Sequence, residues 1–219
     1  MHRLEWRTLT KESHISIEIK KSIFIADAAP ITSAEQAQRF ISERKKQYPD
    51  ATHHVYAWRI GVKEALQKYS DDGEPAGTAG LPVLDILRKN GIDDSIVVVT
   101  RYFGGVQLGT GGLARAYGKA AGAAVSEAQP CICVPAAKYE ISVNYSQSDK
   151  LSRAIEKEGF VIESVRYELN PVLEVLCREG LENRLLEVCG DVTSGQAEIM
   201  HTGDTEMAIG KVGELAVDS

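Results

Sequence analysis

The chain has 219 residues, of which 43% are hydrophobic, 26% charged and 6% aromatic. This composition suits a globular protein with one large domain or two of ordinary size, and the absence of any run of 18 apolar residues excludes a helical membrane span. The net charge of −6 argues against nucleic-acid binding over the whole surface, because nonspecific affinity comes mostly from neutralised phosphates.

The first half of the chain predicts an α/β domain over residues 1–132. Ser33 is a suitable N-cap for its first helix, which Pro49 ends. The run from Ile96 to Phe103 is almost entirely apolar or β-branched, which predicts a central strand covered on both faces. The expected strands are residues 14–20, 22–26, 53–60, 66–70 and 96–103, and the expected helices are residues 33–47, 81–89 and 112–128.

The second half predicts a smaller domain over residues 137–205, after a linker bracketed by Pro130 and Pro135. Its expected order is βαββαβ, the order of a ferredoxin-like split βαβ unit. The tail over residues 206–219 gives no clear pattern. The elements are strands at residues 139–145, 160–167, 172–178 and 196–201, with helices at residues 149–158 and 181–189.

The two halves of the chain differ in net charge. Residues 1–136 carry 17 Lys+Arg and 15 Asp+Glu, whereas residues 137–219 carry 8 and 16. If nucleic acid binds, we therefore expect it to bind the first half. The N-terminal residues include no apolar signal segment, which predicts a cytoplasmic protein.

Two glycine-rich segments stand immediately ahead of predicted helices. The first runs from Asp71 to Gly80 and the second from Phe103 to Gly112. Such a turn exposes unpaired backbone N–H groups at the positive end of the helix dipole, which favours an anion such as phosphate. Tight turns and close helix–strand packing are the alternative role of these glycines. We interpret both segments as binding loops that face one shared depression, with Arg101 at its edge.

Neither segment fits a common nucleotide-binding motif. After Gly109-Thr-Gly111 there is no acidic residue at a strand end about 20 positions later, as a dinucleotide fingerprint requires. A Walker loop is excluded because the spacing from Gly112 to Lys119 is wrong and Ala120 replaces Ser or Thr.

The basic residues near these segments would complete an anion site. Arg101 ends the predicted central strand, and Arg115 and Lys119 lie four residues apart on one face of the next helix. Arginine suits this role because its guanidinium can bind phosphate in a bidentate manner. For Lys119 we prefer a solvated helix face.

Acidic residues and histidines offer further candidates. Asp71, Asp72 and Glu74 are possible metal ligands or acid/base groups, although Asp-Gly is also typical of solvated turns. No second carboxylate cluster accompanies them, and we expect neither a metal nor a cofactor. His53 and His54 are adjacent, so on a strand they face opposite sides and cannot both serve one site.

No candidate for covalent catalysis is visible. There is no nucleophile elbow and no cysteine at a helix start. The cysteines lack zinc-site spacing, and a chain of this length needs no disulfides, so we expect four reduced structural thiols. They are Cys131, Cys133, Cys177 and Cys189.

Three blocks carry a resemblance to a known family. The runs Asp72–Pro82, Val97–Gly105 and Leu108–Tyr117 resemble the IMPACT/YigZ family, and the two-domain order fits as well. The resemblance implies an α+β protein. Its N-terminal domain would resemble domain IV of elongation factor G and the second domain of a small-subunit ribosomal protein, and its ferredoxin-like C-terminal domain would resemble the last domain of that factor.

The resemblance also bears on function. Eukaryotic members regulate translational initiation under amino-acid stress through an additional N-terminal RWD domain. We expect no such domain ahead of Met1–Thr10, so the stress-signalling role is not carried over. What the resemblance implies is contact with RNA or the translation machinery.

We therefore expect a non-enzymatic, translation-associated protein with a role in regulation of translation, which binds RNA or a ribosome-related partner through an anion site in its N-terminal domain. The alternative is an enzyme acting on a small phosphorylated ligand or nucleotide held by the same loops, with Glu74 or Asp71 as the acid/base group. We expect no membrane partner, and the sequence predicts no oligomeric state. The predicted ligand- or anion-binding residues are Gly73, Glu74, Gly77, Thr78, Gly80, Arg101, Gly104, Gly105, Gly109, Thr110, Gly111, Gly112 and Arg115.

Overall fold

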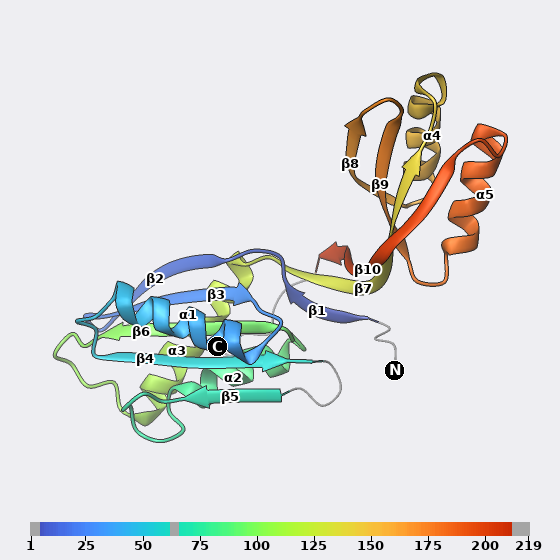
Figure 1. The fold of residues 1–219 in the computed structure, drawn as a ribbon. Coiled ribbons are helices and arrows are strands. Elements are labelled where there is room, and N and C mark those ends of the chain that lie inside the picture. The colour runs from blue at the N-terminus through green and yellow to red at the C-terminus, as the bar shows by residue number, and fades with distance from the viewer. Residues whose placement is uncertain (1–4, 62–65, 212–219) are drawn as a thin grey trace. The chain divides into compact units, whose positions relative to one another are not determined.

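The computed structural model describes residues 5–61 and 66–211, which form two compact units (Figure 1). The N-terminal unit is built mainly from residues 6–132 and the C-terminal unit from residues 133–209. Both units combine helices with antiparallel strands, so the protein is of the α+β class.

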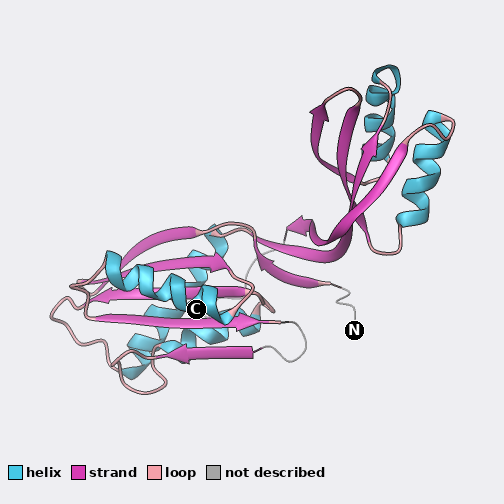
Figure 2. Ribbon diagram, viewed as in Figure 1, coloured by secondary structure: helices cyan, strands magenta, loops and turns pink. Residues whose placement is uncertain are grey.

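The N-terminal unit is a five-stranded antiparallel sheet between two helical layers (Figure 2). One face carries helix α1, and the other face carries helices α2 and α3. In spatial order the strands are β2 (Ser13–Ile19), β3 (Ser22–Pro30), β6 (Ser95–Tyr102), β4 (His53–Ile60) and β5 (Leu66–Ser70). The helices are α1 (Ala34–Gln47), α2 (Gly80–Lys89) and α3 (Thr110–Glu127).

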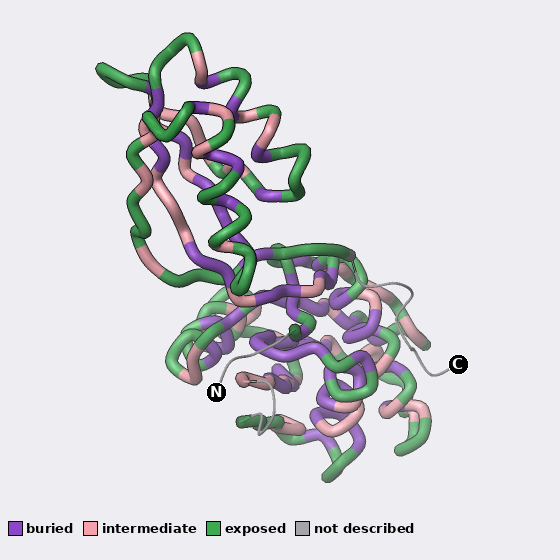
Figure 3. The backbone as a smooth tube through the Cα atoms, turned by 90° about the vertical axis from the view of Figure 1, so that its right-hand side faces the viewer, coloured by how far each residue is buried: buried purple, intermediate pink, exposed green. Residues whose placement is uncertain are grey.

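The central position of β6 follows from its apolar sequence. Val97 and Val99 belong to the core beneath α2 and α3, whereas Ile96 and Val98 pack in the core beneath α1. Successive side chains of a strand point to opposite faces, so a strand covered on both faces has no polar side. Figure 3 follows this burial along the chain. The predicted central strand is confirmed.

Helix α1 begins where its cap was predicted. Ser33 Oγ accepts a hydrogen bond from the backbone N–H of Gln36 at 3.3 Å, which satisfies one of the free donors at the helix start. Phe40 and Ile41 are buried against the sheet.

The C-terminal unit has the βαββαβ order of a ferredoxin-like unit. Its sheet has the spatial order β10-β7-β9-β8, and Leu151, Ile155, Leu173 and Leu185 are buried between the sheet and the helices. The elements are β7 (Pro130–Ser142), α4 (Tyr145–Lys157), β8 (Val161–Tyr167), β9 (Pro171–Arg178), α5 (Glu182–Thr193) and β10 (Glu198–Lys211).

Three features differ from the sequence prediction. Residues 130–135 lie in strand β7, because Pro130 is the first residue of the strand, where a missing N–H costs little, and the following residues are apolar. The boundary between the two units falls after Ile132, within the segment that was predicted as a linker. Strand β1 (Trp6–Leu9) was not predicted, and Leu9 joins the core of the N-terminal unit. Of the tail at 206–219, residues up to 211 belong to β10, and residues 212–219 lie outside the described residues.

The four cysteines are free and buried. Burial raises the pKa of Cys177 and of Cys189 to about 11, so both thiols stay protonated at neutral pH.

No helix among the described residues is long and apolar enough to cross a membrane.

Candidate functional site

The site is built on a row of side chains across three neighbouring strands. Arg101 of β6 pairs in register with His53 of β4 on one side and with Phe24 of β3 on the other. Residues directly opposite each other on paired strands share a face of the sheet. That face is covered by α3, whose Tyr117 makes an edge-to-face contact with Phe24 at 5.2 Å between ring centroids.

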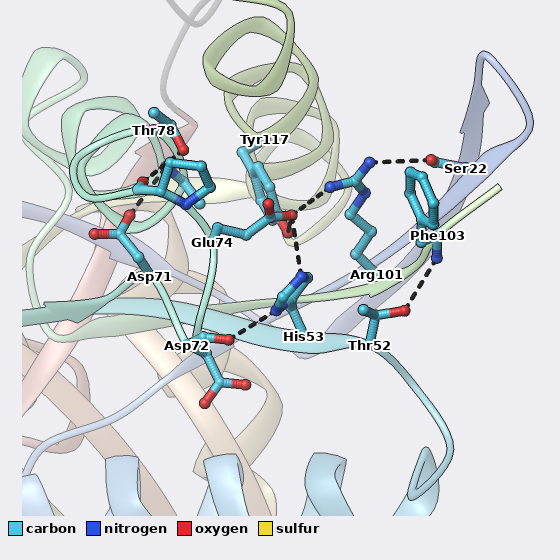
Figure 4. Close-up of polar contacts among 12 residues, drawn as sticks. Ser22, Thr52, His53, Asp71, Asp72, Glu74, Thr78, Arg101, Phe103 and Tyr117 are labelled. Atoms are coloured by element: carbon cyan, nitrogen blue, oxygen red, sulfur yellow. Dashed lines mark hydrogen bonds and ion pairs between the residues drawn. The ribbon is translucent and has the colours of Figure 1, made fainter. Parts of the chain in front are cut away.

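Glu74 enters this row from the first glycine-rich loop and forms a buried ion pair (Figure 4). Its Oε1 accepts hydrogen bonds from Arg101 Nη1 at 2.5 Å and from the Tyr117 hydroxyl at 2.8 Å. The side chains of Glu74 and Arg101 are only 4% and 5% exposed. Arg101 Nη2 also donates to Ser22 Oγ at 3.2 Å. Opposite charge and hydrogen bonds together offset the cost of burying both groups.

Tyr117 serves this carboxylate as a permanent donor. Burial and the neighbouring Glu74 carboxylate both raise the pKa of Tyr117 above its ordinary value. The hydroxyl therefore keeps its proton over the whole physiological range and donates it to Glu74.

His53 is held in a fixed orientation beside the same carboxylate. Its Nδ1 donates to the backbone carbonyl of Asp72 at 2.8 Å, and its Nε2 lies 3.8 Å from Glu74 Oε1. His54 points to the other side of the sheet, where its Nε2 lies 3.0 Å from the carbonyl of Tyr48. The prediction that the two histidines face opposite sides is confirmed.

His53, Glu74 and Arg101 line one depression of about 430 Å³. Both glycine-rich segments contribute to it, the first through Glu74 and Pro75 and the second through residues 107–110. Phe103 stands at its border with 48% of its surface exposed, and the guanidinium carbon of Arg101 lies 5.4 Å from its ring centroid. The lining residues are Thr52, His53, Glu74, Pro75, Arg101, Phe103, Gln107, Leu108, Gly109, Thr110 and Leu113.

The N-terminus of α3 lies at this depression, and no side chain caps it. Gly109, at the N-cap, has a φ of +70° and no side chain with which to cap the helix, and no acidic residue lies in the first turn. The N–H groups of residues 110–112 therefore have no intrahelical partner. Together with the helix dipole they give the depression a positive end.

The start of α2 is different, because the chain supplies its own anion there. The Asp71 carboxylate accepts hydrogen bonds from the backbone N–H groups of Gly77 at 2.9 Å, Ala79 at 3.0 Å and Gly80 at 2.8 Å. We expected this first loop to hold an external anion through its amides. Instead, the carboxylate of Asp71, eight or nine residues before the helix start, occupies these amides, which are therefore not free for an external anion.

Replacing Asp71 with alanine is expected to lower the free energy of unfolding by about 0.5–2 kcal/mol, the usual cost of losing a side-chain cap. Asp71→Asn should cost less, because the amide oxygen still accepts. Urea unfolding of the two variants measures the difference. Equal stability of Asp71→Ala and the parent protein would contradict the assigned role.

Most of the other predicted site residues have structural roles. Thr78 donates its hydroxyl proton to the carbonyl of Pro75 at 2.7 Å. A Cβ on Gly80 would lie 2.7 Å from the backbone of Ser70, and one on Gly104 would lie 2.0 Å from the carbonyl of Lys21. Positive φ angles account for three further glycines, Gly73, Gly77 and Gly105. Gly111 and Gly112 lie in the open first turn of α3.

Arg115 does not share the depression with Arg101. It is exposed and lines a separate groove of about 200 Å³ between α2 and α3, together with Lys119, Asp85 and Lys89. Arg101, which we placed at the edge of a solvent-facing anion site, is buried and paired with Glu74.

Asp72 is also engaged within the chain. Its carboxylate accepts from the backbone N–H of His54 at 2.6 Å and from Lys45 Nζ at 2.9 Å. Although burial opposes it, these two donors lower the pKa of Asp72. The described residues contain no group of three or more His, Cys, Asp or Glu side chains placed to hold a metal ion.

Sequence analysis did not select Phe103 and Tyr117 as site residues. Phe103 directly precedes Gly104-Gly105, and an aromatic residue beside a binding loop was the available signal. Tyr117 lies inside α3, and nothing in the local sequence indicated that its hydroxyl would reach Glu74.

Comparison with known proteins gives three relevant matches and a family profile. The profile described as the Impact N-terminal domain matches residues 20–125. The IMPACT family member YvyE of Bacillus subtilis (strain 168) is 37% identical over 196 residues, which is 88% of each chain. A crystal structure described as that of a hypothetical protein has a TM-score of 0.60 and 30% identity, and the match covers 90% of this chain and 97% of that one.

The third match is a structure of the two-domain translational regulator Yih1. It is 29% identical, with 58% of this chain and 49% of that chain covered, and its TM-score of 0.35 is too low to bear on the fold.

Proposed function

Because the chain belongs to the IMPACT family, we propose that it is a non-enzymatic, translation-associated protein whose N-terminal unit binds RNA through the start of α3. The expected resemblance of the two units to domains of elongation factor G agrees with a partner in the translation machinery. Regulation of translation is the role that this proposal assigns to the protein.

The observation that carries the proposal is the uncapped start of α3. Its free N–H groups border a depression that is open to solvent, and such groups at the positive end of a helix bind phosphate. The contrast with α2, where Asp71 occupies the equivalent groups, supports the view that α3 is left open for an external anion.

Basic side chains follow on α3, in the separate groove between α2 and α3. Arg115 and Lys119 have no hydrogen-bond or ion-pair partner among residues 5–61 and 66–211. They are four positions apart, so their Cα atoms differ by about 6 Å along the helix axis. An RNA backbone with one phosphate at the start of α3 would have further phosphates within reach of these two side chains.

The enzyme alternative has less support. Asp71 is bound by three backbone amides, and Glu74 Oε1 accepts hydrogen bonds from Arg101 and Tyr117. Both carboxylates thus make contacts that hold the first loop in place, and a binding role requires no reaction from either.

Replacing Arg115 with alanine tests the proposal. Contacts to phosphates position the RNA but do not distinguish its bases, so binding should weaken about equally for RNAs of different sequence. The slope of log K against log salt should also fall by about 0.7, the value for each phosphate neutralised on a single strand. Fluorescence anisotropy with short labelled RNAs over a salt series measures both quantities.

Arg39→Ala is the matched control. Arg39 is also exposed but lies on α1, which covers the opposite face of the sheet. Its loss should leave affinity and salt slope unchanged. Equal effects of the two substitutions, or no RNA binding by the parent protein, would overturn the proposed site.

A further inference from the structure

We propose that the depression beside the α3 start accepts one unpaired base of the bound RNA, and that it selects a base with an exocyclic amino group over uracil. The inference rests on the proposed function and adds to it, because phosphate contacts at α3 alone would not distinguish bases. Three features of the depression carry it.

The first feature is an exposed aromatic ring. Phe103 directly follows strand β6, borders the depression and is 48% exposed. The Arg101 guanidinium lies near this ring and is itself fixed by Glu74 and Ser22. The ring thus has a fixed cation beside it while about half of its surface stays free. Aromatic rings in such positions stack on the bases of single-stranded nucleic acid.

The second feature is an acceptor at the floor of the depression. The contacts of Glu74 with Arg101, Tyr117 and His53 all involve Oε1. Within the described part of the chain, Oε2 has no hydrogen-bond partner, and it is not among the fully buried unpartnered atoms. The side chain is 96% buried, since only 4% of it is exposed. Its second oxygen is thus a fixed, solvent-accessible acceptor, and an ionised carboxylate can only accept.

The third feature is the histidine beside it. Because His53 Nδ1 donates to the carbonyl of Asp72, the neutral imidazole has Nε2 as its acceptor. The depression thus presents two acceptors, Glu74 Oε2 and His53 Nε2. An exocyclic amino group has two N–H donors to match them. The O4 of uracil has only lone pairs and would be repelled, and the single N–H at uracil N3 can satisfy only one of the two acceptors.

The size and layout also fit one nucleotide. A volume of about 430 Å³ lies within the range of small-ligand sites. Gly109 and Thr110 line the same depression as Glu74, so the phosphate seat and the acceptors belong to one space.

The test compares five-nucleotide C and U homopolymers, because cytosine has an amino group at C4 where uracil has a carbonyl, and an acceptor at N3 where uracil has an N–H. We expect the parent protein to bind the C oligomer roughly tenfold more tightly than the U oligomer by fluorescence anisotropy. Phe103→Ala should weaken binding of the C oligomer by roughly five- to 100-fold, the range for removing a ring that stacks on a base. Phe103→Trp should retain the affinity.

Val106→Ala is the matched control. Val106 is 39% exposed in the same loop but does not line the depression, so its removal should not affect binding. Thermal unfolding of each variant verifies that the fold is kept.

The outcomes separate the two proposals. Equal affinity for the C and U oligomers overturns the selection of an amino group, and an unaffected Phe103→Ala variant overturns the base site. Either result leaves the proposed function standing if Arg115→Ala still lowers the salt slope. No binding of any oligomer overturns both.

Discussion

Replacing Arg101 with methionine is expected to lower the free energy of unfolding by about 3–5 kcal/mol, the cost of leaving a buried charge without its partner. The Glu74 carboxylate would keep the Tyr117 hydrogen bond but lose both the opposite charge and the donor at 2.5 Å. Methionine fills much of the same volume, so a change in packing contributes little. Chemical denaturation followed by circular dichroism measures the change.

A double variant isolates the ionic contribution. Arg101→Met combined with Glu74→Leu removes both charges, and its stability should return most of the way to that of the parent protein. Arg184→Met is the exposed counterpart, because Arg184 pairs with Glu158 at the surface of the C-terminal unit. We expect its effect to be small by comparison. If Arg101→Met were as mild as Arg184→Met, the buried ion pair would not be a stabilising element of the site.

Replacing Gly104 with alanine is expected to destabilise the N-terminal unit by about 3 kcal/mol or more. A Cβ at this position would lie 2.0 Å from the carbonyl of Lys21 and 2.5 Å from the backbone nitrogen of Ser22. Both obstacles are backbone atoms, so no side-chain rotation relieves the clash. The loop and the β2–β3 turn would have to separate, which would also disturb the hydrogen bond from Gly104 N to Ser22 Oγ.

Gly118→Ala provides the control on the same unit. Gly118 lies inside α3, and a Cβ there would meet nothing within 4 Å. Alanine should therefore stabilise the helix by about 0.5–1 kcal/mol. Denaturation curves that shift in opposite directions for the two variants are the expected result. A Gly104→Ala variant as stable as the parent protein would contradict the close approach of the two backbones.

Much of the fold could be predicted from local patterns. The apolar run of β6 predicted a central strand, and the Ser33 cap predicted the start of α1, because each signal lies within one element. The extent of β7 could not be read in this way. Two prolines bracket its first residues and are typical of a linker, yet the paired strand tolerates them, since Pro130 stands at its first position and Pro135 still accepts a hydrogen bond through its carbonyl.

The site was less accessible to sequence analysis. The glycine-rich segments indicated the region, and both contribute to one depression. The roles of single residues depend on contacts between distant parts of the chain. Glu74 and Arg101 are 27 residues apart, and nothing local indicated that they neutralise each other. Asp71 was a candidate acid/base group, but its reach to the start of α2 became visible only with the loop folded.

The reactivity of the buried thiols can be used to measure how often the core of the C-terminal unit opens. Cys177 and Cys189 both belong to the core of this unit, and their raised pKa values keep the reactive thiolate scarce. A thiol reagent in solution must wait for that core to open before it can react with either residue. In a variant whose Cys131 and Cys133 are replaced by serine, the rate of labelling would thus record the opening of the C-terminal core in the full chain, separately from events in the N-terminal unit.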